Sequence, residues 1–315
     1  MQAYLFVHFR EKPTPDGEQV YFGLSRDGFC WEAVNGGRPV LWSVLGEQGV
    51  RDCTVIRCKT DGMYRIIGTD LSLAHNFRVK YKEHWPTVAR NGSKCLSMWT
   101  SGDLIHWSEQ ELLPLGDENF GCLWAPDVFY DPQQEDYVLH WSSCHRRNDF
   151  GHMGIWFSRT RDFRTFTPPR LLYEKPGAGV IDSAIYVENG QYFLFVKSDK
   201  DPERIILLRG SQVRGPYTRV EAFDESMLAI EAGLYEGATA CRLESGAWCL
   251  FLDYYGVPGE GQGYVPFLAR SLAEGRFVRA DRSFSFPYGY KHGTVIPITV
   301  EEYHRIKSFF DHQEE

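Results

Sequence analysis

Three acidic residues, Asp52, Asp182 and Glu236, each stand at the start of a strand-like segment, although they lie far apart in the chain. A pair of carboxyl groups with separated pKa values can cleave a glycosidic bond: one stays protonated to release the leaving oxygen, and the other is ionised to activate water or attack carbon. A third acid nearby can raise the pKa of the proton donor by like-charge repulsion. The three residues therefore predict acid–base chemistry, provided that the fold brings them together.

An internal repeat indicates how the fold could do so. Five short apolar segments end in serine, at Ser25, Ser101, Ser158, Ser211 and Ser271. An aromatic residue follows each serine by six or eight positions: Trp31, Trp107, Phe166, Tyr217 and Phe277. Self-similarity of this kind is typical of repeat architectures.

Pairs of alternating strand signals joined by turns precede four of these segments, with turns at Asp61-Gly62, near Gln133, at Asn189-Gly190 and at Ser245-Gly246. Each unit then holds four strands, the content of one propeller blade. The fifth unit is split: AYLFVHF and QVYFGLS near the N-terminus lack a first strand, which HGTVIPI from His292 supplies. The sequence predicts an all-β, five-bladed β-propeller that occupies residues 1–315 as a single domain, closed by its two ends. The alternative is a β-sandwich, and one short helix is expected from Glu301 to Phe310.

In a propeller the first strand of each blade lines the central channel, so the starts of the first strands meet at one mouth. Aligning those starts by the apolar residue four places on puts five residues at equivalent positions: Asp52, Ala125, Asp182, Glu236 and His292. Clustered carboxylates repel one another and must be neutralised, paired or bound to metal, so we interpret the cluster as functional. The longer loops between second and third strands, Leu71–Ser93, Cys144–Gly151 and Gly256–Gly263, are expected at the same mouth.

Aromatic residues near this mouth could form a platform for a sugar ring, because apolar sugar faces stack on such side chains. The candidates for substrate binding are Trp124, Phe120, Trp85 and Tyr255.

Composition excludes several classes of partner. The net charge is −8 and no run of Lys or Arg could follow a phosphate backbone, so a nucleic-acid partner is not expected. The apolar stretches are too short for a membrane-spanning helix, so we expect a soluble protein without a membrane partner. Met1 leads into a strand-like segment without the pattern of an export signal, and the eight cysteines show no zinc-site spacing. We therefore expect reduced thiols and a cytoplasmic location; the sequence does not indicate an oligomeric state.

The chain resembles glycoside hydrolase family 43 over nearly its whole length. The similarity lies in the order and spacing of several segments: GVRDCTVIR from Gly49, SGDLIHW from Ser101, WAPDVFYD from Trp124, IDSAIYVENGQYFLF from Ile181, YEGATACRL from Tyr235 and HGTVIPI from His292. The resemblance implies a five-bladed propeller and hydrolysis by single displacement, with inversion at the anomeric carbon.

By this resemblance Asp52 would be the general base, Glu236 the general acid, and Asp182 the residue that orients Glu236 and tunes its pKa. Inversion requires the Asp52 and Glu236 carboxyls to be roughly 6.5 to 9.5 Å apart. Two details depart from the family pattern, because Cys53 follows the base where Pro is common and Lys291 precedes His292 where Arg is frequent. No cofactor is required. His292 would lie near a structural calcium or sodium ion, and the alternative is a neutral histidine hydrogen-bonded within the channel.

The expected substrate is an oligosaccharide from which a terminal sugar is removed, with α-L-arabinofuranose implied first by the resemblance. β-D-Xylose and β-D-galactofuranose are alternatives, since neither spacing nor composition separates them. Two other functions stay open: a sugar-binding propeller without catalysis, and a retaining glycosidase related to fructan-cleaving propellers.

Overall fold

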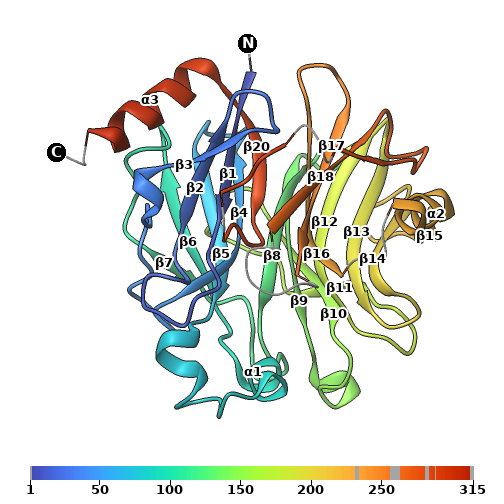
Figure 1. Cartoon of the computed structure of the whole chain (residues 1–315). Coiled ribbons are helices and arrows are strands. Elements are labelled where there is room, and N and C mark those ends of the chain that lie inside the picture. Colours follow the sequence, from blue (N-terminus) through green and yellow to red (C-terminus); the bar gives the residue numbers. More distant parts are fainter. Residues whose placement is uncertain (1, 231–233, 256–262, 281–283, 288, 313–315) are drawn as a thin grey trace.

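The chain folds into five antiparallel sheets of four strands that surround a common axis (Figure 1). The computed structural model describes residues 2–230, 234–255, 263–280, 284–287 and 289–312. Neighbouring first strands contact one another around the ring, so these strands line its centre. The predicted five-bladed β-propeller is confirmed.

The strands occupy four ranks from the axis outward. The first strands are β4 (Val50–Arg57), β8 (Trp124–Asp131), β12 (Val180–Glu188), β16 (Tyr235–Arg242) and β20 (Thr294–Thr299). The second strands are β5 (Tyr64–Asp70), β9 (Asp136–Ser143), β13 (Gln191–Asp199), β17 (Trp248–Tyr254) and β1 (Gln2–His8). The third strands are β6 (Leu96–Ser101), β10 (Gly154–Thr160), β14 (Glu203–Gly210), β18 (Gly263–Ala269) and β2 (Tyr21–Ser25). The fourth strands are β7 (Glu111–Leu113), β11 (Arg170–Tyr173), β15 (Thr218–Arg219), β19 (Val278–Arg279) and β3 (Trp31–Ala33).

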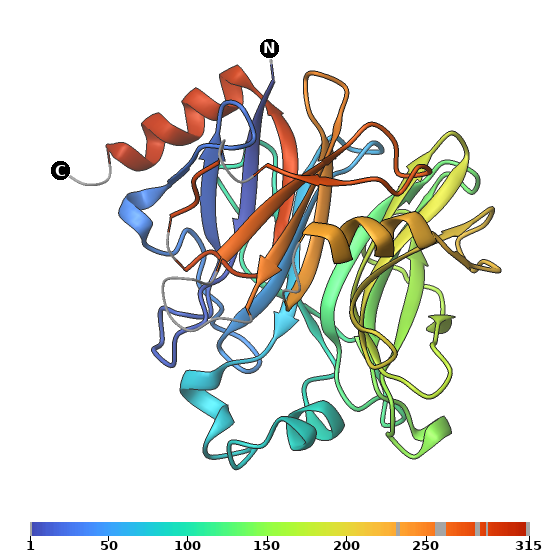
Figure 2. The same ribbon diagram turned by 45° about the vertical axis from the view of Figure 1, so that its right-hand side comes forward.

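The two ends of the chain complete one blade, as predicted. Strand β20 pairs with β1 from Gln2 opposite Thr299 to Val7 opposite Thr294, so main-chain hydrogen bonds close the ring. The predicted short helix is confirmed as α3 (Val300–Asp311), which begins with a capping box between Thr299 and Glu302. This helix packs on the outside of the closing blade, where its apolar side chains join the core of β1 and β2 (Figure 2).

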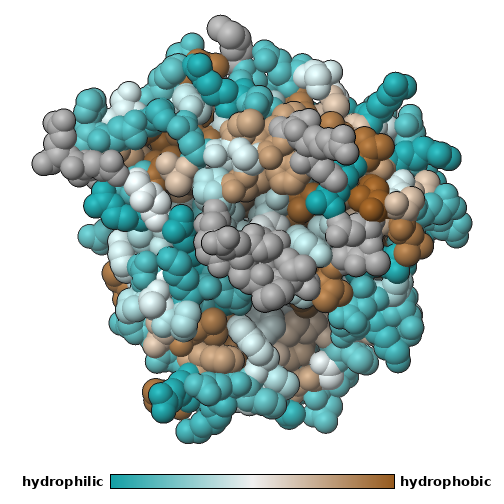
Figure 3. Space-filling model, in the orientation of Figure 1, coloured by the Kyte–Doolittle hydropathy of each residue, from teal (hydrophilic) through white to brown (hydrophobic). Residues whose placement is uncertain are grey.

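The hydrophobic cores lie between neighbouring blades. One core joins side chains of β5 and β6, such as Ile67 and Met98, to Leu139 and Trp141 of β9. Because each sheet buries both faces against its neighbours, its strands read as nearly continuous apolar runs. On the face shown in Figure 3, brown and teal side chains are interspersed.

The repeated hydroxyl residue has a structural role at the turn from the third to the fourth strand. The Ser25 and Ser101 hydroxyls accept main-chain N–H bonds from residues three places on, and an aspartate two places on accepts two more. In the second blade Thr160 and Asp162 make this motif, so the alignment on Ser158 is wrong by two residues. With Thr160 in place, the aromatic residue follows by six positions in every blade.

The β5–β6 and β9–β10 connections lie at one end of the ring, the lower end in Figure 1. The loop between β5 and β6 carries the π-helical turn η2 (Leu73–Phe77) and the helix α1 (Trp85–Asn91), and the loop between β9 and β10 carries the 3₁₀ turn η3 (Arg146–Asn148). A further 3₁₀ turn, η1 (Asn35–Gly37), precedes β4, and α2 (Glu221–Ile230) follows β15. Of the predicted loop Gly256–Gly263, residues 256–262 lie outside the described residues.

Among the described helices, none combines the length and the apolar character that crossing a membrane requires. All eight cysteines are free thiols in the structure, as predicted.

Candidate active site

Four of the five first strands carry a β-bulge close to their start, where the pairing with the second strand shifts. At each bulge one residue adopts a left-handed backbone, with φ of 52° at Asp52, 47° at Ala125, 55° at Asp182 and 57° at Gly237. A bulge bends its strand and re-aims a side chain, and aspartate tolerates this backbone better than most residues. The repeated bulge therefore places the Asp52 and Asp182 carboxyls at equivalent points of the channel mouth.

The bulges correct the alignment of Glu236. The residue equivalent to Asp52 and Asp182 is Gly237, and Glu236 stands one position earlier, where it pairs in register with Asp253 of β17. Glycine is required at the bulge because a Cβ atom on Gly237 would lie 2.8 Å from the ring of His292. The third carboxyl therefore comes from the regular strand position just before the bulge.

His292 lies between two of the three acids. Its Nδ1 atom is 3.4 Å from Asp52 Oδ1 and 3.9 Å from Asp182 Oδ2, and all three side chains are largely buried. The main-chain N–H of Gly237 donates to Asp182 Oδ2 at 3.3 Å, which connects Asp182 to the residue after Glu236. The structure thus brings Asp52, Asp182 and His292 into direct contact and joins Glu236 to them through one main-chain bond.

The environment separates the pKa values of these groups. Burial raises the pKa of Asp182 to about 6, opposed by His292 and assisted by the negative charges of Glu236 and Asp52. Burial also acts on Asp52, but the hydrogen bond and charge of His292, together with Arg51 and Thr69, lower its pKa below 3.8. Burial opposes the charging of His292, yet the surrounding acids raise its pKa to about 9. Near neutral pH, Asp52 is therefore a carboxylate that faces an imidazolium.

Second strands of three blades send a polar side chain to the start of the next blade from the same register position. The main-chain N–H of Ala125 donates to Thr69 at 2.8 Å, that of Asp182 donates to Ser142 at 3.1 Å, and that of His292 donates to Asp253 at 3.1 Å. The Thr69 hydroxyl in turn donates to Asp52 Oδ2 at 2.9 Å. Polar groups on β5, β9 and β17 therefore fix the first strands that carry the site.

Two lysines supply positive charge to the same region. Lys197 of β13 occupies the repeated second-strand position, and its Nζ lies 3.4 Å from Glu236 Oε2 and contacts the Tyr255 hydroxyl. Lys291 Nζ lies 2.9 Å from Oδ2 of Asp253, which is fully buried. These ammonium groups offset part of the negative charge that the acids bring to the mouth.

The four aromatic residues predicted to bind substrate differ in their surroundings. Trp85 is 40% exposed and meets Trp124 edge to face, with ring centroids 6.0 Å apart and planes at 87°, and it also packs on Phe77. Tyr255 lies beside Glu236 through its contact with Lys197. Phe120 is 4% exposed and packs against Trp141 and Trp156 in a blade core, so its ring offers no open face on which a sugar could stack.

The described residues do not fit the metal site that the family resemblance implied. Among them, no group of three or more His, Cys, Asp or Glu side chains is arranged to hold an ion. His292 directs Nδ1 at the Asp52 and Asp182 carboxylates, so this nitrogen already faces two protein groups.

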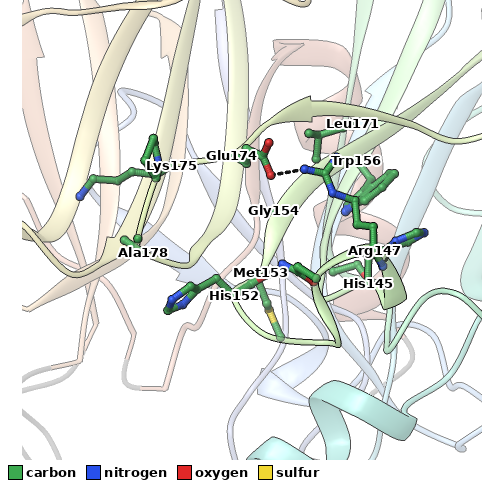
Figure 4. Close-up of a pocket in the computed structure, with 14 residues that line it drawn as sticks. His145, Arg147, His152, Met153, Gly154, Trp156, Leu171, Glu174, Lys175 and Ala178 are labelled. Atoms are coloured by element: carbon green, nitrogen blue, oxygen red, sulfur yellow. Dashed lines mark hydrogen bonds and ion pairs between the residues drawn. The ribbon is translucent and has the colours of Figure 1, made fainter.

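A separate cavity of about 310 Å³ opens between the second and third blades (Figure 4). The β9–β10 loop and the segment that leads into β12 line it, and an ion pair between Arg147 and Glu174 spans them at 2.5 Å. Its wall includes Ser143, next to the Ser142 that holds Asp182, but none of the three acids. This cavity therefore lies outside the carboxylate cluster.

Sequence reasoning missed Lys197, Asp253, Thr69 and Lys291 as parts of the site. A signal for three of them was present, since Thr69, Lys197 and Asp253 are polar residues at the ends of otherwise apolar second strands. Their contacts with the site can be identified only from the packing of the next blade.

The close approach of His292 to Gly237 can be tested by Gly237→Ala. We expect this variant to lose roughly 1–3 kcal/mol of unfolding free energy, because the new Cβ must displace the imidazole and occupy a left-handed backbone. Gly190→Ala is the matched control: Gly190 also has a positive φ, of 74°, but no atom within 4 Å of an added Cβ. Urea denaturation of both variants measures the difference, and equal losses would contradict the proposed steric contact.

The charge of His292 predicts a pH-dependent stability. Its pKa is raised in the folded state, so its contribution is complete below the ordinary value of 6.5 and is lost as pH rises through about 9. We therefore expect the unfolding free energy of the wild type to exceed that of His292→Gln by more at pH 6 than at pH 9.5. Urea titrations at both pH values check this, and a difference independent of pH would show that His292 is neutral in the fold.

Comparisons with known proteins agree with this architecture. Residues 1–304 match the family model Glyco_hydro_43_rel, described as "Probable glycosyl hydrolase domain". The chain is similar to an α-L-arabinofuranosidase of Bifidobacterium longum subsp. longum, with 25% identity over 218 residues, which are 63% of this chain and 20% of that protein. The chain thus spans about a fifth of the length of this curated relative.

Solved structures share the fold at low sequence identity. An exo-β-1,3-galactanase from Phanerochaete chrysosporium with galactose is 14% identical, with a TM-score of 0.60 over 88% of this chain and 60% of that chain. A thermostable family-43 glycoside hydrolase is also 14% identical, with a TM-score of 0.51 over 79% of this chain and 77% of that chain. Since the family model covers nearly the whole sequence, the chain belongs to this family of glycosyl hydrolase domains related to glycoside hydrolase family 43.

Proposed function

We propose that the chain is an inverting, exo-acting glycoside hydrolase that releases terminal α-L-arabinofuranose from oligosaccharides. One observation carries the proposal: Asp52 and Asp182 lie within 4 Å of the same His292 nitrogen, yet their pKa values are shifted in opposite directions. The lowered pKa keeps Asp52 ionised, as a general base for water requires, and Asp182 is the acid beside the proposed proton donor Glu236.

The geometry supports a distinct role for each acid. Asp52 is held ionised by His292 and by the Thr69 hydroxyl, as a general base that deprotonates water must be. Glu236 is the general acid that protonates the leaving oxygen. Asp182 accepts the N–H of Gly237 and so holds the main chain next to Glu236.

We assign binding of the sugar ring to Trp85 and Trp124, whose rings meet edge to face. Trp124 directly precedes the bulge of β8, and Trp85 presents an exposed ring beside it. An apolar sugar face can stack on Trp85 while hydroxyls bond the acids. The arabinofuranosidase relative favours α-L-arabinofuranose as the sugar.

The proposal predicts release of aryl alcohol from 4-nitrophenyl α-L-arabinofuranoside, with the β-D-xylopyranoside and β-D-galactofuranoside as comparison substrates. Proton NMR of the first product should show the anomer opposite to that of the substrate, because a water molecule attacks from the face opposite to the leaving group. If the retained anomer forms first, Asp52 acts as a nucleophile and not as a general base. Faster cleavage of either comparison substrate would reassign the sugar.

Asp52→Asn is expected to lower kcat/KM by roughly 10²–10⁴-fold, because the carboxamide cannot accept a proton from water. The matched control is Asp149→Asn, which removes an acid from the β9–β10 loop whose side chain is 96% exposed, and it should retain wild-type activity. Calorimetric binding of arabinose oligosaccharides should persist in Asp52→Asn. Binding by a wild type that cleaves none of the substrates would indicate a sugar-binding propeller instead.

A further inference from the structure

We propose that Lys197 and Tyr255 position the Glu236 carboxyl for proton transfer to the leaving oxygen. This inference rests on the proposed function, since it assigns a role within the same site.

The Lys197 side chain is buried, and its ammonium lies beside Glu236 and Tyr255. It is 8% exposed on β13, and its ammonium lies 3.4 Å from Glu236 Oε2, contacts the Tyr255 hydroxyl and stands 4.0 Å from the centre of the Tyr255 ring. The charges of Glu236, Tyr255 and Asp182 raise the pKa of Lys197 against the effect of burial. Burying an ammonium is costly unless polar or acidic groups surround it, and Glu236, Asp182 and the Tyr255 hydroxyl do so here.

The place of Lys197 in the repeat explains why a cation is needed in this blade. At the equivalent position β5, β9 and β17 carry Thr69, Ser142 and Asp253, which accept main-chain N–H groups of the next blade. Lys197 instead reaches a side chain, because the acid of β16 precedes its bulge and is not fixed by it.

Glu236 also needs an anchor on physical grounds. A glutamate has one more rotatable bond than an aspartate, and the Glu236 side chain is 26% exposed, compared with 16% for Asp52 and 10% for Asp182. Without a partner the carboxyl would sample several rotamers, and displacement by about 1 Å can cost roughly 100-fold in rate. Lys197 holds Oε2, with Tyr255 fixing the ammonium, and Oε1 delivers the proton.

Lys197 exchanges no proton in this scheme. Glu236 gives its proton to the glycosidic oxygen as the bond from that oxygen to the anomeric carbon breaks, and the bonding pair stays on the oxygen. Water attacks the anomeric carbon while Asp52 takes its proton. The carboxylate formed on Glu236 then faces the ammonium, so Lys197 is a positioning residue whose charge also stabilises the product of proton transfer.

The test compares two aryl glycosides of the sugar that the wild type cleaves. A 2,4-dinitrophenolate leaves without protonation, whereas an unsubstituted phenolate requires the general acid. Lys197→Met should lower kcat/KM for the phenyl glycoside by roughly 10-fold to 100-fold and for the dinitrophenyl glycoside by less than about threefold. Lys197→Arg should restore part of the loss. Tyr255→Phe, a mild change, should lower the phenyl rate alone by about fivefold, as for one hydrogen bond.

Lys94→Met is the matched control, since the Lys94 ammonium donates to the main-chain carbonyls of Gly92 and Gly121 rather than to an acid. It should leave the ratio of the two rates unchanged. Equal losses on both substrates in Lys197→Met and in Tyr255→Phe would overturn the positioning role and leave the proposed function intact. A wild type that cleaves no aryl glycoside would instead overturn the proposed function, and the role of Lys197 with it.

Discussion

The charge balance at the channel mouth is the constraint on which the rest of the site depends. Asp52, Asp182, Glu236 and Asp253 meet there with largely buried side chains, and carboxylates cannot be gathered in this way unless cations or protons offset them. Three positive side chains stand among them: His292 faces Asp52 and Asp182, Lys197 faces Glu236, and Lys291 faces Asp253. The residual imbalance appears as raised pKa values, about 6 for Asp182 and about 7 for Asp253, both caused first by burial.

The repeated blade lets this cluster form without additional structural elements. A bulge near the start of four first strands turns one residue toward the mouth, and side chains of the preceding blades hold β8, β12 and the segment that leads into β20. Because the same local geometry recurs around the ring, residues separated by more than a hundred positions converge without any long-range element of their own. Two departures from the repeat lie at the proposed site: a glycine preceded by a glutamate in β16, and a lysine on β13.

The positively charged His292 is also connected to Lys291, one of the two departures from the family pattern. The described residues offer no ligand set for an ion, and an imidazolium already supplies a positive charge between the two aspartates. Lys291, where related sequences often carry arginine, pairs with Asp253, and that aspartate also accepts the main-chain N–H of His292. Lys291 therefore helps to position His292, whose positive charge offsets the two aspartates. Cys53, where proline is common, lies in the bulge beside Asp52 and is 1% exposed.

The sequence by itself determined the five-bladed ring, its closure by the two termini, the helix near the C-terminus and the identity of the converging acids. These features follow from local periodicity and from a repeat, both of which a linear sequence displays. Only the tertiary structure decided the offset of Glu236 from the bulge, the burial of Phe120, the shift of the hydroxyl motif to Thr160, and the partners Lys197 and Asp253. Each of these depends on how one blade packs against the next. A bulge, a buried face or a countercharge is defined by the neighbouring strand, so it produces no periodic pattern in the sequence.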